Sequence, residues 1–439
     1  MSSFSFVVKS GGSFKGELVV PGDKSISHRA IMLGALAHGI TEIEHFLMSE
    51  DALATLQAFR LMGVKIEKVE YEKVRIQGVG LQGLKTPEKA IDCGNSGTAM
   101  RLLAGILVGQ PFNSVLIGDD SLMKRPMQRI IAPLIEMGAH IISNETGRAP
   151  LKIKGNRVLQ GIHYKMPIAS AQVKSCLLLA GLFAKGKTKV IEPVITRNHT
   201  ENMLRHFGYK IVCKGNAVEL EGGGRLSGTH IIVPGDISSA AFFMVGASIA
   251  KESDVLLKTV GVNPTRIGVV NILRMMGAYI QLKNERELSG EPVADIVVKS
   301  RALHGIDIPI DQVPLAIDEF PVLFIAAACA KGTTMLRHAK ELRVKESDRI
   351  VVMAEGLKTL GIKTEVMEDG IQIEGGQLTG GKINSYGDHR VAMAFAIAGL
   401  RAKEEIIVED CANVATSFPN FVELSKNVGL KINLVKGSL

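Results

Sequence analysis

The sequence contains no tryptophan among its 439 residues, and aromatic residues make up only 5% of it. Surfaces that bind single-stranded nucleic acid stack the bases on aromatic rings and gather basic residues along a groove. Here the basic residues are scattered along the chain, although the net charge is +8. We therefore expect small acidic ligands rather than a nucleic-acid partner.

Cysteine is scarce as well, and the five cysteines are odd in number and far apart: Cys93, Cys176, Cys213, Cys329 and Cys411. None of them shows CxxC or Cys/His ligand spacing, which argues against a zinc site and a disulfide framework. The N-terminal MSSFSFVVKSGG has no apolar signal core, and no apolar run reaches the ~18 residues of a membrane span. We expect a cytoplasmic protein without a metal and without a membrane partner.

The glycine-rich segment DCGNSGTAMR, at 92–101, does not have the pattern of a nucleotide-binding loop. It contains neither GxxxxGK[ST] nor the Rossmann fingerprint. Gly94 and Gly97 leave room for a ligand to approach the backbone, and Ser96 and Thr98 offer hydroxyl groups. We therefore expect no nucleotide cofactor, and no cofactor of any other kind.

What the sequence does contain is an internal repeat. Six times, an amphipathic segment ends at a glycine and a short strand-like segment follows, at intervals of roughly 70 to 85 residues. Glycine just beyond a helix end is the expected left-handed cap. The six glycines are Gly63, Gly138, Gly208, Gly277, Gly361 and Gly429.

Each repeat also has a short, wholly apolar helix that a polar cluster precedes. A helix without a polar face is buried on all sides. Its N-terminus attracts anions, so six such helices that converge would make an anion-binding centre. In the alternative interpretation, the Asp, Ser and Asn residues are only helix caps. The clusters are GDKS at 22–25, GNSG at 94–97, IASAQ at 168–172, PGDISS at 234–239, AIDEF at 316–320 and YGDHR at 386–390.

The two halves of the chain also match directly. LVVPGDKS at 18–25 resembles IIVPGDIS at 231–238. Such a duplication predicts two domains of three repeats each, with a boundary near residue 235.

Several cations lie in these clusters. Lys24, Ser25 and Arg29 combine a point charge, a hydroxyl and a planar guanidinium at the start of a buried helix. A buried Arg needs a partner, which a phosphate or carboxylate ligand would supply; the alternative partner is a protein carboxylate. Lys124 and Arg125 precede Pro126, which can start the next helix, and they indicate either an anion site or a solvated loop.

The acidic candidates lie in the second half. In LRVKESDR, Lys345 and Arg349 are at i and i+4 on a helix, and Glu346 can pair with Arg349. The alternative is an exposed, salt-bridged helix start. Asp318 and Glu319 precede an apolar helix, where one can cap it and the other can act as a base. Asp388, His389 and Arg390 have the matching place in the last repeat.

Together these motifs closely resemble the 5-enolpyruvylshikimate-3-phosphate synthase family of enolpyruvyl transferases, over essentially the whole chain. GDKSISHR, GNSGTAMR, KRP, SAQ, DEFP, LRVKESDR, GDHR and TSFP occur in the family order. The resemblance implies an α/β fold of two similar domains, each of three βαβαββ units. It is a pseudo-threefold, inside-out α/β barrel with the active site in the interdomain cleft. We expect domains of 21–235 and of 1–20 plus 236–439, joined by a double-crossover hinge.

The resemblance also implies a reaction. The enolpyruvyl (carboxyvinyl) group of phosphoenolpyruvate is transferred to the 5-hydroxyl of shikimate 3-phosphate, phosphate is released, and the product serves chorismate and aromatic amino-acid biosynthesis. The alternatives are a UDP-N-acetylglucosamine enolpyruvyl transferase, which typically has a reactive Cys in the loop matching 117–126, and a non-catalytic metabolite-binding protein. That loop has no Cys here. We expect a monomer.

The family roles carry over residue by residue. The catalytic residues implied are Lys24, Asp318 and Glu346. The shikimate 3-phosphate ligands implied are Lys24, Ser25, Arg29, Ser170, Ala171, Gln172, Arg197, Asp318 and Lys345. The phosphoenolpyruvate ligands implied are Lys24, Gly97, Arg125, Gln172, Arg349 and Arg390.

The chain departs from one branch of the family at two positions. Thr416 replaces a Lys before the SFP motif, and Leu102 replaces a Pro. Glyphosate-tolerant members often have Ala at the position of Gly97, so Gly97 favours sensitivity to this inhibitor.

Overall fold

The computed structural model describes residues 4–436, and its contacts divide the chain into two compact units. Unit 1 comprises Met1–Pro21, Pro234–Glu287 and Pro292–Leu439, and unit 2 comprises Gly22–Val233 and Leu288–Glu291. The chain passes from one unit to the other at Pro21/Gly22 and Val233/Pro234, and again on both sides of Leu288–Glu291.

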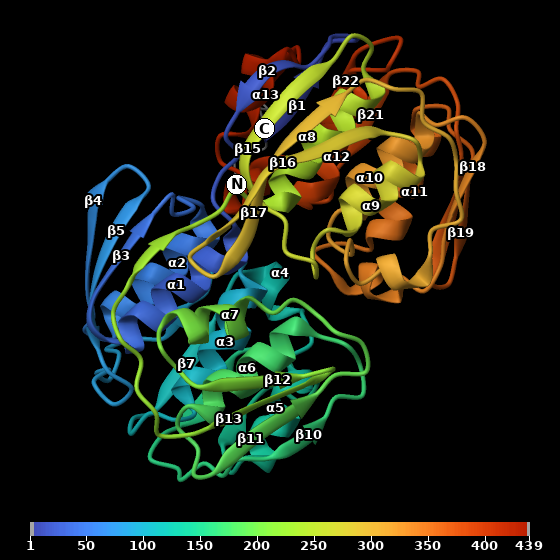
Figure 1. Cartoon of the computed structure of the whole chain (residues 1–439). Helices are drawn as coiled ribbons and strands as arrows, with labels where there is room; N and C mark the ends of the chain where they lie inside the picture. Colours follow the sequence, from blue (N-terminus) through green and yellow to red (C-terminus); the bar gives the residue numbers. More distant parts are fainter. Residues whose placement is uncertain (1–3, 437–439) are drawn as a thin grey trace. The chain divides into compact units, whose positions relative to one another are not determined.

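Unit 2 contains three four-stranded sheets that share one topology (Figure 1). In each, the first strand is parallel to its neighbour and the other pairs are antiparallel. The first sheet is β14 (His230–Ile232), β3 (His38–Glu44), β5 (Lys73–Val79) and β4 (Lys65–Glu70). The second is β6 (Ile91–Asp92), β7 (Ser114–Ile117), β9 (Leu151–Lys154) and β8 (His140–Ile142). The third is β10 (His163–Lys165), β11 (Lys187–Ile191), β13 (Ala217–Glu221) and β12 (Ile211–Lys214).

Unit 1 repeats this plan, except that one of its three sheets has three strands, all antiparallel. Its sheets are β2 (Lys15–Leu18), β15 (Asp254–Gly261), β17 (Glu291–Lys299) and β16 (Tyr279–Leu288); β18 (Thr333–Leu336), β20 (Gly370–Glu374) and β19 (Thr364–Met367); and β21 (Gly381–Asn384), β22 (Ile406–Glu409), β1 (Phe4–Val8) and β23 (Ile432–Lys436). The predicted α/β fold of repeated units is confirmed.

Two helices accompany each sheet. The inner helices of unit 2 are α1 (Lys24–Leu36), α3 (Gly97–Leu107) and α6 (Ala171–Gly181), and those of unit 1 are α8 (Ile237–Ile249), α10 (Phe320–Ala328) and α12 (His389–Ala398). The second helices are α2 (Glu50–Leu61), α5 (Gln128–Glu136), α7 (His199–His206), α9 (Gly268–Met275), α11 (Arg349–Thr359) and α13 (Phe421–Val428). The short pieces are α4 (Asp120–Met123), η1 (Ile310–Gln312), η2 (Lys340–Val344) and η3 (Ala412–Thr416).

Two strands are exchanged between the halves of the sequence. β2 precedes α1 in the chain but pairs in parallel with β15, where Leu18 lies opposite Leu257. β14 precedes α8 but pairs in parallel with β3, where Ile231 lies opposite Ile43. These are the strands of the two duplicated segments, so each supplies the first strand of a repeat in the other half.

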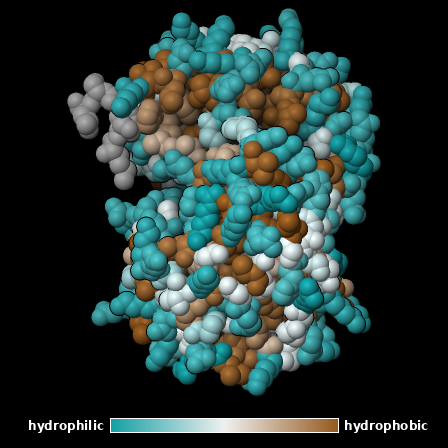
Figure 2. Space-filling model, turned by 90° about the vertical axis from the view of Figure 1, so that its left-hand side faces the viewer, coloured by the Kyte–Doolittle hydropathy of each residue, from teal (hydrophilic) through white to brown (hydrophobic). Residues whose placement is uncertain are grey.

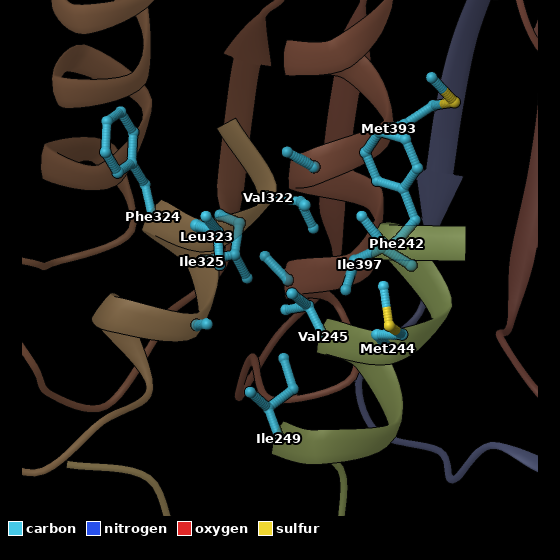
Figure 3. Packing of buried hydrophobic residues seen from close by; sticks show 14 of the residues in the cluster. Phe242, Met244, Val245, Ile249, Val322, Leu323, Phe324, Ile325, Met393 and Ile397 are labelled. Carbon is cyan, nitrogen blue, oxygen red and sulfur yellow. The ribbon is translucent and has the colours of Figure 1, made fainter. Parts of the chain in front are cut away.

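The inner helices form the cores. In unit 1, every residue of α8 is buried, and Figure 3 shows Phe242 and Val245 of this helix close to Val322 of α10 and Ile397 of α12. α1, α3 and α6 lie in the matching core of unit 2. The prediction that these helices are buried on all sides is confirmed, because nearly all of their residues beyond the first turn are buried.

The six glycine caps are also confirmed. All six glycines have positive φ angles, between 80° for Gly208 and 118° for Gly429. An L-residue with a side chain is strained in that region, so glycine ends each helix and turns the chain into the next strand.

The surface is mixed in character. Figure 2 shows hydrophilic side chains interspersed with hydrophobic patches on the face that it displays. No helix among residues 4–436 is both long and apolar enough to cross a membrane.

Candidate functional site

In unit 2, the polar clusters at the starts of α1, α3 and α6 do act as helix caps. The Asp23 carboxylate accepts a hydrogen bond from the Ile26 amide at 2.9 Å. Ser96 accepts from the Ala99 amide at 3.1 Å, and Ser170 from the Val173 amide at 3.4 Å. The capping interpretation is therefore right for these residues, and it leaves the cations beside them to be explained.

Side chains near these helix starts link every pair of the three helices. The guanidinium of Arg29 in α1 donates to the Ser175 hydroxyl in α6, and His28 in α1 lies beside Ser96 at the start of α3. α3 and α6 are joined by Arg101 and Gln172, whose Nη1 and Oε1 atoms are 2.5 Å apart. The starts of α1, α3 and α6 therefore lie close together.

Arg29 is buried, and within residues 4–436 no carboxylate contacts its guanidinium. Its Nε donates to Thr200 Oγ1 at 2.7 Å, its Nη1 to the Ser25 carbonyl at 2.9 Å, and its Nη2 to Ser175 Oγ at 2.8 Å. Burial lowers the pKa of Arg29 to about 10, although the charges of Glu201 and Asp23 oppose this shift. The alternative of a protein carboxylate partner is therefore wrong, and the charge of Arg29 suits an anionic ligand.

Lys24 has an acidic partner that the sequence analysis missed. Its ammonium lies 2.9 Å from Asp51 Oδ2 in α2, and both side chains are largely buried. Asp51 is 27 positions away in the sequence and looks like an ordinary acidic residue of a first helical turn. The Asp51 carboxylate thereby fixes the ammonium group of Lys24 at the start of α1.

Gly97 makes room for two guanidinium groups. A Cβ atom at this position would lie 3.0 Å from Arg101 Nη1 and 3.2 Å from Arg125 Nη1. Arg125 Nη2 also donates to Asn95 Oδ1 at 2.9 Å. The absence of a side chain at Gly97 therefore lets Arg101 and Arg125 lie together at the start of α3.

The neighbouring Lys124 behaves differently from Arg125. Its side chain is exposed, so the solvated-loop interpretation holds for Lys124, whereas Arg125 is half-buried. α5 begins at Gln128, two residues after Pro126. The expectation that Pro126 starts this helix is wrong, since Met127 occupies the cap position.

Gln172 is fixed in orientation by two partners. Its Oε1 accepts from Arg101, and its Nε2 donates to Thr98 Oγ1 at 3.0 Å. Sequence reasoning did not select Arg101, although it lies one helical turn after Gly97 in the quoted motif. Ser170 and Ala171 lie beside Gln172 at the start of α6, and Arg197 lies in the half-buried segment before α7.

In unit 1, three carboxylate groups surround the guanidinium of Arg349. Its Nε lies 2.8 Å from Asp388, its Nη2 lies 2.8 Å from Glu346, and its Nη1 lies 3.7 Å from Asp318. Burial disfavours its charge, but Asp388, Glu346 and Asp318 outweigh burial and raise the pKa of Arg349 above its usual value. Arg349 stays charged and orients two of the predicted catalytic carboxylates.

The expected helical spacing of Lys345 and Arg349 is wrong. α11 begins only at Arg349, because the Asp348 carboxylate caps it by accepting from the Val351 amide at 3.1 Å. Lys345 therefore lies before the helix, and its ammonium is 3.3 Å from Asp318. The predicted pair of Glu346 and Arg349 is confirmed.

Arg390 is held by the segment that precedes α10. Its Nη1 donates to the Asp318 carbonyl at 3.0 Å and lies 3.7 Å from Glu319 Oε1. Glu319, which is buried, also accepts from Ser238 and lies 3.5 Å from Arg266, a cation that sequence reasoning missed. Glu319 occupies the cap position of α10, but its side chain makes no capping hydrogen bond.

The two departures from the family pattern lie in different settings. Leu102 is a fully buried core residue of α3. Thr416 is also buried, and its hydroxyl donates to the Asn413 carbonyl at 2.7 Å. No charged group stands at position 416, so the other cations of the site must act without it.

Two other segments of unit 2 have the sequence patterns of nucleotide-binding motifs. GLFAKGKT at 181–188 has the pattern GxxxxGK[ST], and GVGLQG at 78–83 has the pattern GxGxxG. Parts of both line a cavity of about 820 Å³. Their geometry is opposite to that of a phosphate loop, because α6 ends at Gly181 and β5 leads to β6 without a helix. A helix C-terminus carries negative partial charge, which disfavours phosphate.

Metal-ligating side chains do not gather in the described part of the chain. Between residues 4 and 436, no group of three or more His, Cys, Asp or Glu residues could hold a metal ion.

Three comparisons relate this chain to known proteins. The family model described as EPSP synthase (3-phosphoshikimate 1-carboxyvinyltransferase) matches residues 8–424. The 3-phosphoshikimate 1-carboxyvinyltransferase of Methylococcus capsulatus is 59% identical over 98% of each chain, and that of Nitrosococcus oceani is 60% identical over 98% of this chain and 97% of its own. A solved structure of EPSP synthase from Acinetobacter baumannii is 56% identical, covers 99% of this chain and 100% of its own, and gives a TM-score of 0.89.

Proposed function

The chain belongs to the EPSP synthase (3-phosphoshikimate 1-carboxyvinyltransferase) family, and we propose that it joins phosphoenolpyruvate to shikimate 3-phosphate. The carboxyvinyl group of phosphoenolpyruvate is transferred to the 5-hydroxyl of shikimate 3-phosphate, and phosphate is released. The protein is an enzyme of the transferase class, and the pathway is that of aromatic amino-acid biosynthesis.

The chemistry of the two substrates explains the need for cations. Both are multiply charged anions that repel each other, so bringing them together needs fixed positive charge. Arg29 offers a buried guanidinium whose hydrogen bonds, in the described part of the chain, go to three neutral oxygens, and this observation best supports the proposal. Arg suits two-point contacts to phosphate and carboxylate groups, and Lys acts as a point charge.

In the proposal, shikimate 3-phosphate is bound by cations and helix starts of unit 2, with help from unit 1. Its phosphate contacts Arg29, and its ring lies near Gln172, whose amide orientation is set by Arg101 and Thr98. The full proposed set is Lys24, Ser25, Arg29, Ser170, Ala171, Gln172, Arg197, Asp318 and Lys345.

Phosphoenolpyruvate is assigned to the remaining cations. Arg125 lies against Gly97 at the start of α3, where a carboxylate or phosphate can approach both guanidinium and backbone. The full proposed set is Lys24, Gly97, Arg125, Gln172, Arg349 and Arg390.

The proposed chemistry is an addition followed by an elimination. Asp318 accepts the proton of the 5-hydroxyl as its oxygen attacks C2 of phosphoenolpyruvate, and Glu346 takes part in the proton transfer at C3. Lys24 neutralises charge on both substrates. The C2–O bond to phosphate then breaks as a proton leaves C3, which restores the double bond. These steps call for no cofactor.

Phosphate release tests this proposal. The enzyme is incubated with phosphoenolpyruvate and either shikimate 3-phosphate or UDP-N-acetylglucosamine, and inorganic phosphate is measured. Release only with shikimate 3-phosphate is expected. Release only with the sugar nucleotide would assign the other enolpyruvyl transfer, and release with neither would favour a binding protein.

We propose that the protein is cytoplasmic, since all five cysteines are unpaired, and that it is a monomer. We also propose that the chain crossings at Pro21/Gly22 and Val233/Pro234 act as a hinge. X-ray scattering tests the hinge, because an unchanged radius of gyration with both ligands present would contradict it.

A further inference from the structure

The hairpin of β16 and β17 has a tip that belongs to unit 2. Leu288–Glu291 is grouped with unit 2 by its contacts, whereas the chain on either side belongs to unit 1. The Ser289 hydroxyl accepts a hydrogen bond from the Ile232 amide at 2.9 Å. Glu291 is only 2% exposed. A carboxylate at a hairpin tip is normally solvated, so its burial needs an explanation.

Glu291 is bound by the first turn of α7. Its Oε1 lies 2.9 Å from His199 Nδ1 and accepts from Asn202 Nδ2 at 3.2 Å. An ionised carboxylate can only accept hydrogen bonds, so Nδ1 of His199 carries the proton. His199 is itself buried and is the first residue of α7. The hairpin tip therefore holds the start of this helix through a buried, charge-assisted contact.

The next two residues of α7 reach the proposed phosphate site. Thr200 accepts from Arg29 Nε at 2.7 Å and donates to Ser175 Oγ at 2.7 Å. Glu201 lies 2.7 Å from the ammonium of Lys174, which is fully buried in α6. Three successive residues of one helix start thus contact the hairpin tip, Arg29 and α6.

The contacts of Arg29 depend on this helix start. Two of its three hydrogen bonds go to Thr200 and Ser175, and these hydroxyls also bond to each other. Arg197, another proposed phosphate ligand, lies two residues before His199. A shift of the first turn of α7 would therefore move the hydroxyl groups that orient Arg29 and the nearby backbone that carries Arg197.

We propose that Glu291 is a positioning residue for the binding of shikimate 3-phosphate: by holding His199 and Asn202, it fixes the first turn of α7 and so the orientation of Arg29. The inference rests on the proposed function and deepens it, because it assigns to the hairpin tip a role in acceptor affinity. Glu291 acts through α7 and makes no contact with the reacting atoms.

The charge of Glu291 also acts on Arg29 directly. Together with Glu201 and Asp23, it opposes the lowering of the Arg29 pKa that burial causes. Removing the charge of Glu291 therefore makes the charged form of Arg29 less favourable. It also weakens the hydrogen bonds that fix the first turn of α7. Both effects act on the affinity for a phosphate.

The test is Glu291→Gln, which keeps the shape of the side chain and removes its charge. We expect the KM for shikimate 3-phosphate to rise about tenfold, because a charged hydrogen bond in a buried site is lost. The KM for phosphoenolpyruvate and kcat are expected to stay within about twofold, since the phosphate of the acceptor takes no part in bond breaking. Calorimetric binding of shikimate 3-phosphate alone measures the same loss without turnover.

The matched control is Glu287→Gln, four residues earlier on the same hairpin. Glu287 is exposed, so this variant is expected to leave all kinetic constants unchanged. Asn202→Ala removes the second contact of Glu291, together with an exposed hydrogen bond from Arg205, and is expected to raise the same KM by about two- to threefold. It carries the test if Glu291→Gln fails to fold.

Three outcomes are informative in different ways. A selective rise in the KM for shikimate 3-phosphate, in the order Glu291→Gln above Asn202→Ala, supports the positioning role. Equal rises in both KM values, or a lower melting temperature with unchanged kinetics, would overturn it. A wild-type enzyme that is inactive with shikimate 3-phosphate would instead contradict the proposed function.

Discussion

At the scale of single residues, two buried arginines show how the same side chain serves different ends. Arg29 donates to three neutral oxygens, so its charge suits an anionic ligand. Arg349 is surrounded by Asp318, Glu346 and Asp388 and holds them in place. In the sequence, each is a cation near the start of a buried or half-buried helix. Only the groups around each side chain show whether it suits a ligand or instead holds other residues of the protein in place.

Gly97→Ala tests the space at the start of α3. The added methyl group would lie 3.0–3.2 Å from the guanidiniums of Arg101 and Arg125, so their flexible ends must move by a few tenths of an ångström. We expect a KM for phosphoenolpyruvate that is raised about tenfold, an unchanged KM for shikimate 3-phosphate, and little loss of stability. Steady-state kinetics and a melting curve measure this.

The same variant addresses inhibition by glyphosate. The wild type is expected to be inhibited, and Gly97→Ala to be less so. An uninhibited wild type at millimolar glyphosate would contradict this expectation. An unchanged KM for phosphoenolpyruvate in the variant would show that Arg125 does not depend on the space at Gly97.

His28 gives the enzyme a pH-dependent stability. Burial, followed by the charges of Lys24 and Arg29, lowers the pKa of His28 to about 3 from its ordinary value of 6.5. Below pH 6.5 the unfolded chain binds a proton that the folded protein does not, so stability falls as the pH falls towards 3. Between pH 7 and pH 5, we expect His28 to account for a loss of about 2 kcal/mol.

Urea unfolding followed by circular dichroism measures this loss, since the chain has no tryptophan. In His28→Gln the difference in unfolding free energy between pH 7 and pH 5 is expected to shrink by about 2 kcal/mol. The comparison is between two pH values of one variant, so any constant cost of the substitution cancels. An equal pH dependence in both proteins would refute the role of His28.

At the scale of elements, the starts of the inner helices hold both the capping residues and many of the proposed ligand-binding residues. Asp388 illustrates this, since it caps α12 and also receives Arg349 from the start of α11. The Asp388 carboxylate accepts hydrogen bonds from free amides at the start of α12, and it thereby also fixes Arg349 at the start of α11. Helix starts that are linked in this way should lose stability together.

Arg349→Met tests that coupling. The substitution keeps much of the apolar volume but leaves buried Asp388 without its guanidinium, which is expected to cost about 3–5 kcal/mol of unfolding free energy. Activity should fall below detection, because Asp318 and Glu346 lose their common partner. Lys358→Met, at an exposed position of the same helix, is the control and should change neither quantity. A stable Arg349→Met protein would show that the three carboxylates do not depend on this cation.

At the scale of the whole molecule, the exchanged strands make the two units unequal. Unit 2 draws all of its sheet strands from residues 22–233, including β14. Unit 1 needs β1 and β2 from the N-terminus, and β1 lies between β22 and β23. The two units are alike in topology but differ in how continuous their chains are.

Fragments of the chain test this difference. Residues 22–233 alone are expected to fold and to melt cooperatively, although without the contact of Glu291 to α7. Residues 234–439 alone are expected not to fold, because one sheet lacks its inner strand β1 and another lacks β2. Circular dichroism of both fragments measures this.

A permuted fragment is the matched control. Phe4 and Lys436 are partners in neighbouring strands, so a short linker can join residue 439 to residue 1. The fragment 234–439–linker–1–21 is expected to fold. Cooperative melting of 234–439 without the added strands would contradict the argument.

The sequence by itself determined the local features of this protein. The sequence predicted the six apolar helices and the polar clusters at their starts. It also predicted the glycines that end the second helix of each repeat, because capping and burial depend on neighbouring residues. The family resemblance placed the motif residues, and the structure brings Asp318, Lys345, Glu346 and Arg349 together as expected.

Only the tertiary structure decided which residues hold these groups. Asp51 is 27 positions from Lys24, Arg101 is 71 from Gln172, and Glu291 is 92 from His199. Nothing in the local sequence marks such partners, since a contact across the fold depends on strand exchange and helix packing. Local chemistry therefore fixes where a helix starts, and long-range packing fixes what its first turn can bind.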